Sequence, residues 1–119
     1  LDCDRWNMLH PGEKPRRSYV ERTLGSHGGP FVAATDYMRI VPDQVRAWVP
    51  GRYVVLGTDG YGRSDSRAAL RDHFEVDRRH VALAALKALS DDGALDAATV
   101  RKAVAALGID PERPNPVTL

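Results

Sequence analysis

The 119-residue sequence has one cysteine, Cys3, no long apolar run, little aromatic content and almost no net charge. A single cysteine excludes an internal disulfide and any metal site that needs several cysteine ligands. No apolar run approaches the roughly 20 residues that a membrane-spanning helix needs. With 17 basic and 16 acidic side chains, the net charge of +1 gives no reason to expect binding to nucleic acid or to an anionic membrane.

The first residues also lack an initiator methionine and the features of a signal peptide. The segment "LDCDRWNMLHP" has neither the basic stretch nor the apolar stretch that a secretion signal requires. We therefore expect the chain to be part of a longer polypeptide and to lie in the cytoplasm, which the scarcity of cysteine also fits. The length suits one domain with a modest core.

The residue pattern predicts an α/β organisation. Residues 1–30 are broken by proline and glycine, so we expect an irregular lead-in with one or two helical turns near residues 18–24. Residues 31–76 are predicted to run strand, helix, strand, loop and helix, and the short apolar runs at 31–35 and 53–56 are typical of buried strands. A helical stretch is predicted between them from Asp36 to residue 49, with an inward stripe of Val41, Val45, Trp48 and Val49. Pro42 is expected in its first turn or at a kink, because proline has no N–H to donate.

Residues 77–108 are predicted to form a pair of helices. Asp77 and Asp96 are good N-caps, and Gly93 and Gly108 stand where the helices should end. Helical spacing predicts buried positions at Val81, Ala84, Ala85, Ala88, Leu89, Val100, Ala103, Val104 and Leu107. Residues 109–119 hold three prolines and are expected to form an extended tail. Two strands alone make a poor sheet, so we expect strands from elsewhere to complete it.

The stretch "GTDGYGRSDSR", residues 57–67, is the strongest candidate for a site. Its glycines are suited to bring backbone N–H groups near an anion at the start of the next helix. The spacing matches neither G-x-x-x-x-G-K-[ST] nor G-x-G-x-x-G, however. A structural corner is the other interpretation, in which serines cap the helix and arginines pair with aspartates. The residues concerned are Asp59, Gly60, Gly62, Arg63, Ser64, Asp65, Ser66 and Arg67.

The sequence shows no other pattern of residues with the spacing of a metal site, a catalytic site or a DNA-reading helix pair. The four histidines (His10, His27, His73 and His80) show no metal-ligand spacing, and no G-x-S-x-G motif is present. The helix pair resembles a DNA-reading pair only in outline, because Arg101 and Lys102 are preceded by Asp91, Asp92 and Asp96. We therefore predict no catalytic or metal-binding residue in this chain.

Three longer blocks resemble one family. "DCDRWNMLHP" at 2–11, "ATDYM" at 34–38 and "GTDGYGRSDSR…L…HFEV" at 57–76 resemble the C-terminal end of the homodimeric pyruvate dehydrogenase E1 component. The order and spacing of the blocks agree, and so does the ending with Asn115-Pro116. The resemblance covers nearly the whole chain. It implies part of a three-layer α/β domain, of the transketolase C-terminal kind, that helps to organise a dimer.

For the parent enzyme, the resemblance implies thiamine diphosphate and magnesium as cofactors. It also implies decarboxylation of pyruvate and transfer of the acetyl unit to the lipoyl group of the E2 acetyltransferase. The expected partners are the rest of the E1 chain, the second E1 subunit and E2. This chain lacks the family's G-D-G…N motif for magnesium and diphosphate, so the resemblance implies no cofactor-binding or catalytic residue here and no activity of the piece alone.

Two alternatives stay open from the sequence. One is a stand-alone interaction or anion-binding module of the same fold, and the other is a small helical nucleic-acid-binding protein.

Overall fold

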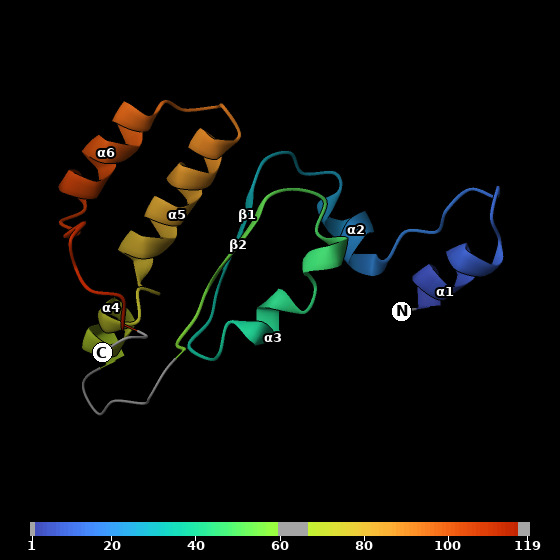
Figure 1. Cartoon of the computed structure of the whole chain (residues 1–119), viewed down its shortest axis with the longest axis horizontal. Helices are drawn as coiled ribbons and strands as arrows, with labels where there is room; N and C mark the ends of the chain where they lie inside the picture. Colours follow the sequence, from blue (N-terminus) through green and yellow to red (C-terminus); the bar gives the residue numbers. More distant parts are fainter. Residues whose placement is uncertain (1, 60–66, 117–119) are drawn as a thin grey trace.

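The computed structural model describes residues 2–59 and 67–116 (Figure 1). In chain order its elements are α1 (Asp2–Leu9), α2 (Tyr19–Leu24), β1 (Phe31–Ala34), α3 (Ile40–Asp43), the 3-10 turn η1 (Arg46–Trp48), β2 (Tyr53–Leu56), α4 (Arg67–His73), α5 (Arg78–Asp91) and α6 (Ala97–Ala106). The predicted alternation of strands and helices, ending in a helix pair, is confirmed.

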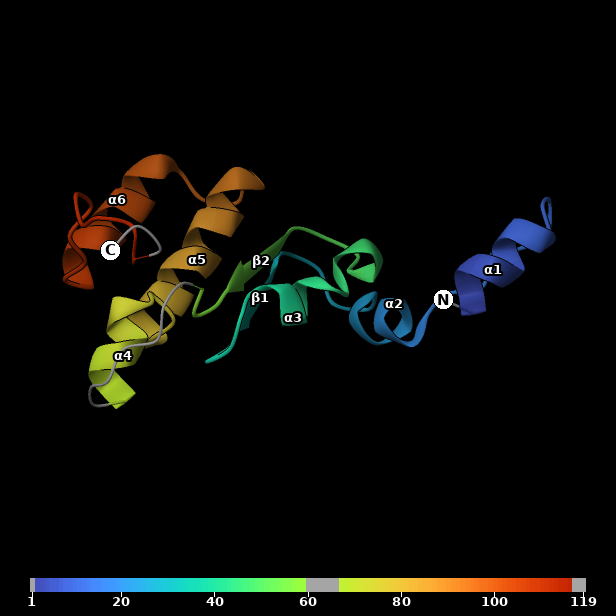
Figure 2. The ribbon, with the colours of Figure 1, turned by 60° about the horizontal axis from the view of Figure 1, so that its bottom comes forward.

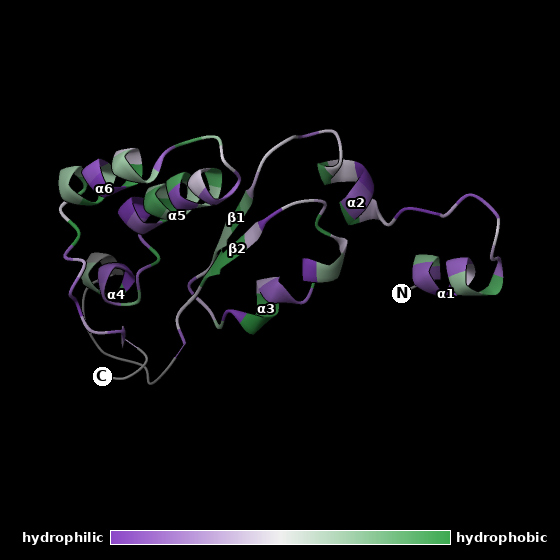
Figure 3. Cartoon of the chain, turned by 45° about the horizontal axis from the view of Figure 1, so that its top comes forward, coloured by the Kyte–Doolittle hydropathy of each residue, from purple (hydrophilic) through white to green (hydrophobic). Residues whose placement is uncertain are grey.

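The two strands form a parallel sheet. Phe31 lies opposite Tyr53, and Ala34 lies opposite Leu56. Helix α5 packs against both strands and against α6. Figures 1 and 2 show α5 on one side of the strand pair and α3 on the other, while Figure 3 shows that both strands are mainly hydrophobic. The strand pair and α5 therefore make the centre of the structure.

The buried core is small. Among the described residues, the buried side chains are Phe74 and Val76 between α4 and α5, His80 and Ala88 in α5, and Val100 in α6. The radius of gyration is 17.6 Å, whereas a compact chain of this length would have about 13.5 Å. Helix α1 stands away from the sheet (Figure 1), and Trp48 Nε1 donates to Asp4 of α1 at 3.1 Å. The molecule is elongated, with its core at the α4, α5 and α6 end.

The predicted irregularity of residues 1–30 is wrong for residues 2–9, which form α1. Acidic residues in the first turn, Asp2 and Asp4, favour a helix through its dipole. One turn apart, the rings of Trp6 and His10 stack at 4.2 Å between centroids, and the Arg16 guanidinium lies 3.9 Å from the Trp6 ring. This helix depends on polar and aromatic contacts, so apolar periodicity does not reveal it.

The short helix expected near residues 18–24 is confirmed as α2. Ser18 accepts a hydrogen bond from Glu21 N, and the Glu21 side chain accepts one from Ser18 N, which together form a capping box.

The helical stretch predicted over 36–49 is confirmed only in part, and Pro42 lies in the first turn of α3. Only α3 and η1 are helical there, and Val41 and Val45 are 47% and 37% exposed instead of forming a buried stripe. The cause lies at the end of β2. Asp59 accepts a hydrogen bond from the main-chain N–H of Arg39, at 2.9 Å, and Thr58 N donates to Tyr37 O, also at 2.9 Å. The bond to Tyr37 O takes the acceptor that a helix from Asp36 would offer to Val41 N, which donates to Met38 O instead.

Helices α5 and α6 begin and end where the sequence predicts. Asp77 accepts a hydrogen bond from His80 N, and Asp96 accepts one from Thr99 N. Gly93 and Gly108 have φ of +83° and +69°, the left-handed conformation expected just after a helix. Of the predicted inward positions, Ala88 and Val100 are buried, and the others are half-buried. Local capping signals therefore define this pair.

The tail is less extended than predicted. A turn forms where Arg113 N donates to Asp110 O at 3.2 Å, and Arg113 then reaches Asp72 of α4.

Across residues 2–59 and 67–116, none of the helices has the length and apolar character that a membrane span requires.

Gly57 is expected to be irreplaceable, because a Cβ there would lie 2.8 Å from Arg39 N and 2.9 Å from Tyr37 O. Gly57→Ala should cost about 1–3 kcal/mol of unfolding free energy, measured by urea denaturation followed by circular dichroism. The matched control is Gly28→Ala, where a Cβ meets nothing within 4 Å and the change should stay within about 0.5 kcal/mol. Equal denaturation midpoints for the two variants would contradict this account of the turn.

Candidate functional site

A cavity lies at the carboxyl end of β1. Its volume is about 640 Å³, and it is lined by Ala34, Thr35, Asp36, Arg71, Val76, Asp77, Arg78 and Arg79. We call it the arginine pocket. The end of β1 supplies its first three residues, α4 supplies one, and the α4–α5 junction with the start of α5 supplies the rest. In open α/β sheets, ligands bind at this carboxyl edge of the strands.

One side of the arginine pocket is fixed by a two-pronged ion pair. Arg71 donates through Nε to Asp36 Oδ1 at 3.2 Å and through Nη2 to Asp36 Oδ2 at 2.9 Å. Hydrogen bonding and attraction by Asp36 raise the pKa of Arg71, so it stays cationic. The main-chain oxygen of Asp36 also accepts from Thr58 Oγ1 at 2.8 Å. This pair joins α4 to the segment after β1.

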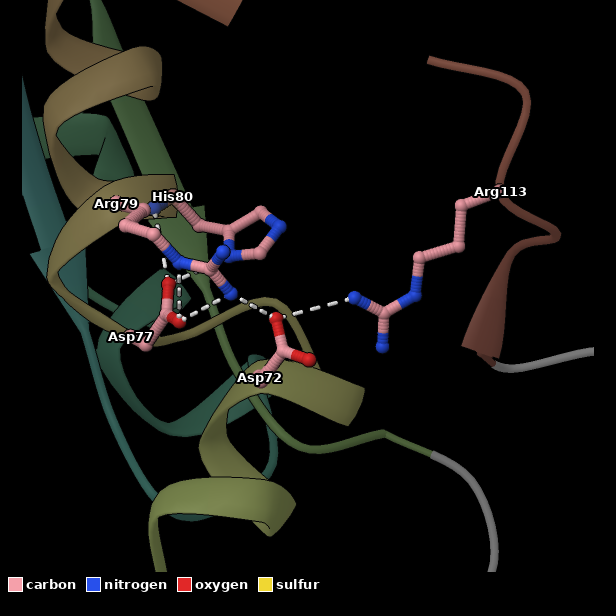
Figure 4. A network of polar contacts seen from close by, with 5 residues as sticks. All are labelled: Asp72, Asp77, Arg79, His80 and Arg113. Atoms are coloured by element: carbon pink, nitrogen blue, oxygen red, sulfur yellow. Dashed lines mark hydrogen bonds and ion pairs between the residues drawn. The ribbon is translucent and has the colours of Figure 1, made fainter. Parts of the chain in front are cut away.

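The other side is fixed by a network of charged residues, Asp72, Asp77, Arg79, His80 and Arg113 (Figure 4). Arg79 donates through Nε to Asp77 Oδ2 at 3.1 Å and through Nη2 to Asp72. Asp72 also accepts from Arg113 Nη1 at 3.2 Å. The network therefore ties α4, the start of α5 and the C-terminal tail together.

Asp77 has three tasks in this network. Its carboxylate caps α5, bonds Arg79, and lies 2.6 Å from His80 Nδ1. Burial acts to raise the pKa of Asp77, but hydrogen bonds from His80 and Arg79 outweigh it and hold that pKa below its usual value. Asp77 is therefore ionised at neutral pH and orients the ring of His80, which is 7% exposed.

The same cluster has the spacing of a metal site but not its electrostatics. Candidate ligand atoms of Asp72, Asp77 and His80 lie within 4.8 Å of one another. However, Arg79 and Arg113 both pair with Asp72 Oδ1, and Arg79 also pairs with Asp77 Oδ2. A cation would have to displace or approach these guanidinium groups, which like-charge repulsion opposes. The geometry fits a structural salt network better than a metal centre.

A second, smaller cavity of about 260 Å³ lies at the end of β2. Glu75 lines it and has φ of +59°. The conformation follows from how α4 ends: Glu75 N donates to Asp72 O at 3.1 Å and Val76 N to Arg71 O at 2.9 Å, the two bonds of a Schellman motif. Glu75 thus occupies a position that usually holds glycine, and its backbone is explained by helix termination.

Of the candidate residues in this loop, the structure describes Asp59 and the backbone of Arg67. Asp59 accepts from the main-chain N–H and the Nε of Arg39, both at 2.9 Å. The main-chain bond, followed by the side-chain bond, lowers the pKa of Asp59 against the opposing effect of burial. Arg67 begins α4, while Gly60, Gly62, Arg63, Ser64, Asp65 and Ser66 lie outside the described residues. The predicted pairs between the loop's aspartates and arginines stay predictions, and Arg39 is a partner the sequence did not indicate.

Sequence reasoning also missed the arginine pocket. Its arginines come from α4 and α5, and Arg71 is 35 residues from the Asp36 it binds. The available signals were an aspartate directly after a predicted strand, in "ATDYM", and two arginines directly after an N-cap, in "DRRH". Neither string suggests the other, so only the fold brings them together.

Comparison with known proteins gives one consistent result. A family model described as the transketolase-like TK C-terminal domain matches residues 5–77. A pyruvate dehydrogenase E1 component from Pseudomonas aeruginosa is 57% identical over 118 residues, which is 98% of this chain. E1 components from Cupriavidus necator and Escherichia coli are 53% and 51% identical, over 99% and 97% of this chain. The chain spans 13% of the length of each of these relatives.

Acid stability tests the role of Asp77. Its lowered pKa means that it stabilises the fold above its unfolded-state value of about 3.9 and that this contribution disappears as the pH falls through the lower folded value. Asp77→Asn keeps an N-cap oxygen but removes the charge. We expect the melting temperature of the variant to fall less steeply than wild type between about pH 5 and pH 3. Exposed Glu13→Gln, outside the helices, is the control and should follow wild type; a wild-type slope for Asp77→Asn would refute the assignment.

Proposed function

The chain belongs to the family of transketolase-like C-terminal domains, and we propose that it is the C-terminal portion of a pyruvate dehydrogenase E1 component. The observation that carries the proposal is the 57% identity to an E1 component along 98% of this chain. In the proposal, the parent enzyme acts in the cytoplasm. It decarboxylates pyruvate with thiamine diphosphate and magnesium, and it passes the acetyl unit to the lipoyl group of the E2 acetyltransferase.

The described residues do not fit the cofactor itself. Magnesium would need oxygen ligands that do not already pair with cations. In the described part of the chain, the cluster with cation-ligand spacing is Asp72, Asp77 and His80. Arg79 bonds both of its carboxylates, and Arg113 bonds Asp72 as well. We therefore propose no cofactor contact by these residues and no turnover by the chain alone. Its contribution in the parent enzyme is structural.

Exposed apolar side chains support a structural role. Tyr37, Met38, Ile40, Val41 and Val45 are all exposed within nine residues, and we call residues 37–45 the apolar segment. Such a concentration on the surface is typical of an interface. In the part of the chain that the structure describes, the sheet has two strands, and no further described strand pairs with either edge. We propose that the rest of the E1 chain and the second E1 subunit cover the apolar segment and extend the sheet, so that the chain helps to organise the dimer.

A chimera tests this proposal. The final 118 residues of the Pseudomonas aeruginosa E1 component would be replaced by the matching residues of this chain, and pyruvate decarboxylation and dimer mass would be measured. We expect a dimeric, active enzyme. Removal of the segment without replacement should abolish activity. A chimera that is soluble and dimeric but inactive would contradict the proposal.

The same chimera tests the apolar segment. Ile40→Asp, at a side chain 62% exposed in this chain, would bury an unpaired carboxylate in the dimer and should weaken dimer formation at least about tenfold. Ala98→Asp is the control, because Ala98 is exposed in the first turn of α6, where an acidic residue is favourable. Dimer formation that is equally strong in both variants would show that the second E1 subunit does not cover the apolar segment.

A further inference from the structure

We propose that the arginine pocket binds a small molecule carrying a phosphate group, and that Arg78 is the cation that recognises it. The inference does not depend on the proposed function. The lining residues include three arginines, Arg71, Arg78 and Arg79, and two aspartates, Asp36 and Asp77. The charge balance of the lining is therefore positive. A volume of about 640 Å³ falls within the range of about 300–1,000 Å³ that is usual for small-molecule sites.

Two of the arginines are held in place by their ion pairs. Arg71 uses Nε and Nη2 on Asp36, and Arg79 uses the same two nitrogens on Asp77 and Asp72. Within the described residues, the Nη1 of each guanidinium donates no hydrogen bond. Each arginine thus keeps a donor whose orientation is already fixed by a carboxylate. Fixed donors lose little freedom when an anion binds, which favours affinity.

Arg78 differs from its two neighbours in the pocket. Its side chain is exposed, and it has no ion-pair partner within residues 2–59 and 67–116. It is also the first residue of α5, whose first turn contains no acidic residue. A cation at the positive end of a helix dipole is unfavourable unless an anion lies nearby. Asp77 lies at this helix end, but its carboxylate is bonded to Arg79 and His80 and makes no ion pair with Arg78 among the described residues. The charge of Arg78 is therefore left for a ligand.

The remaining polar groups are compatible with an anion. The carboxylates of Asp36 and Asp77 already accept hydrogen bonds from arginine, which reduces their repulsion of a second anion. Thr35 Oγ1 accepts from Tyr37 N at 3.1 Å, so the hydroxyl proton of Thr35 is available to donate. Donors from the end of β1, from α4 and from α5 therefore line one cavity. Three directions of approach suit a tetrahedral phosphate better than a planar carboxylate.

Phosphate titration of the protein expressed from its own gene tests the site. Inorganic phosphate would be titrated at constant ionic strength, with chloride as the balancing anion, and followed by calorimetry and by amide NMR shifts at the start of α5. We expect Arg78→Gln to weaken phosphate binding at least about tenfold. Arg101→Gln removes the same charge from an exposed position on α6 and should change the affinity by less than about twofold.

Two further arms make the result decisive. Arg78→Lys keeps the charge but loses the planar donor pair, so its affinity should lie between those of wild type and Arg78→Gln. Acetate should bind more weakly than phosphate, because it offers fewer oxygen atoms to the three sets of donors. The proposal is overturned if wild type shows no saturable phosphate binding, if Arg78→Gln and Arg101→Gln weaken it equally, or if acetate binds more tightly than phosphate.

Discussion

A parallel sheet of only two four-residue strands is the constraint on which the rest of the structure depends. Parallel strands are stable when helices cover both faces and further strands lie beside them. Here α5 covers one face, and the described residues bury few apolar side chains. The extension to 51 Å and the exposed apolar segment follow from this shortage.

Charged contacts hold α4, α5 and the C-terminal tail in positions that the small core alone does not set. A single exposed ion pair contributes about 0–1 kcal/mol, but here Asp72 and Asp77 each serve more than one partner. Asp77 is at once a helix cap, an anchor for Arg79 and the group that orients His80. Because these roles share one carboxylate, the start of α5, the end of α4 and the shape of the arginine pocket are set together.

Local signals predicted the strands, α2 and the helix pair, since apolar runs and caps such as Asp77 and Asp96 act within a few residues. Prediction failed where long-range contacts decide the backbone. Asp59 bonds the main chain of Arg39 twenty residues away, and Thr58 N takes the Tyr37 oxygen that a helix from Asp36 would use. The arginine pocket could not be predicted for the same reason, because its residues meet only after β1, α4 and α5 are assembled.

Two of the three strings that resemble the family, "ATDYM" and the one that begins "GTD", lie at the ends of neighbouring strands, and their described residues are hydrogen-bonded. Thr58 Oγ1 donates to Asp36 O, and Asp59 holds Arg39, which lies just after the first string. Asp36 in turn holds Arg71 of the arginine pocket. The stretch that identifies the family and the pocket that the sequence concealed are two ends of one hydrogen-bonded unit.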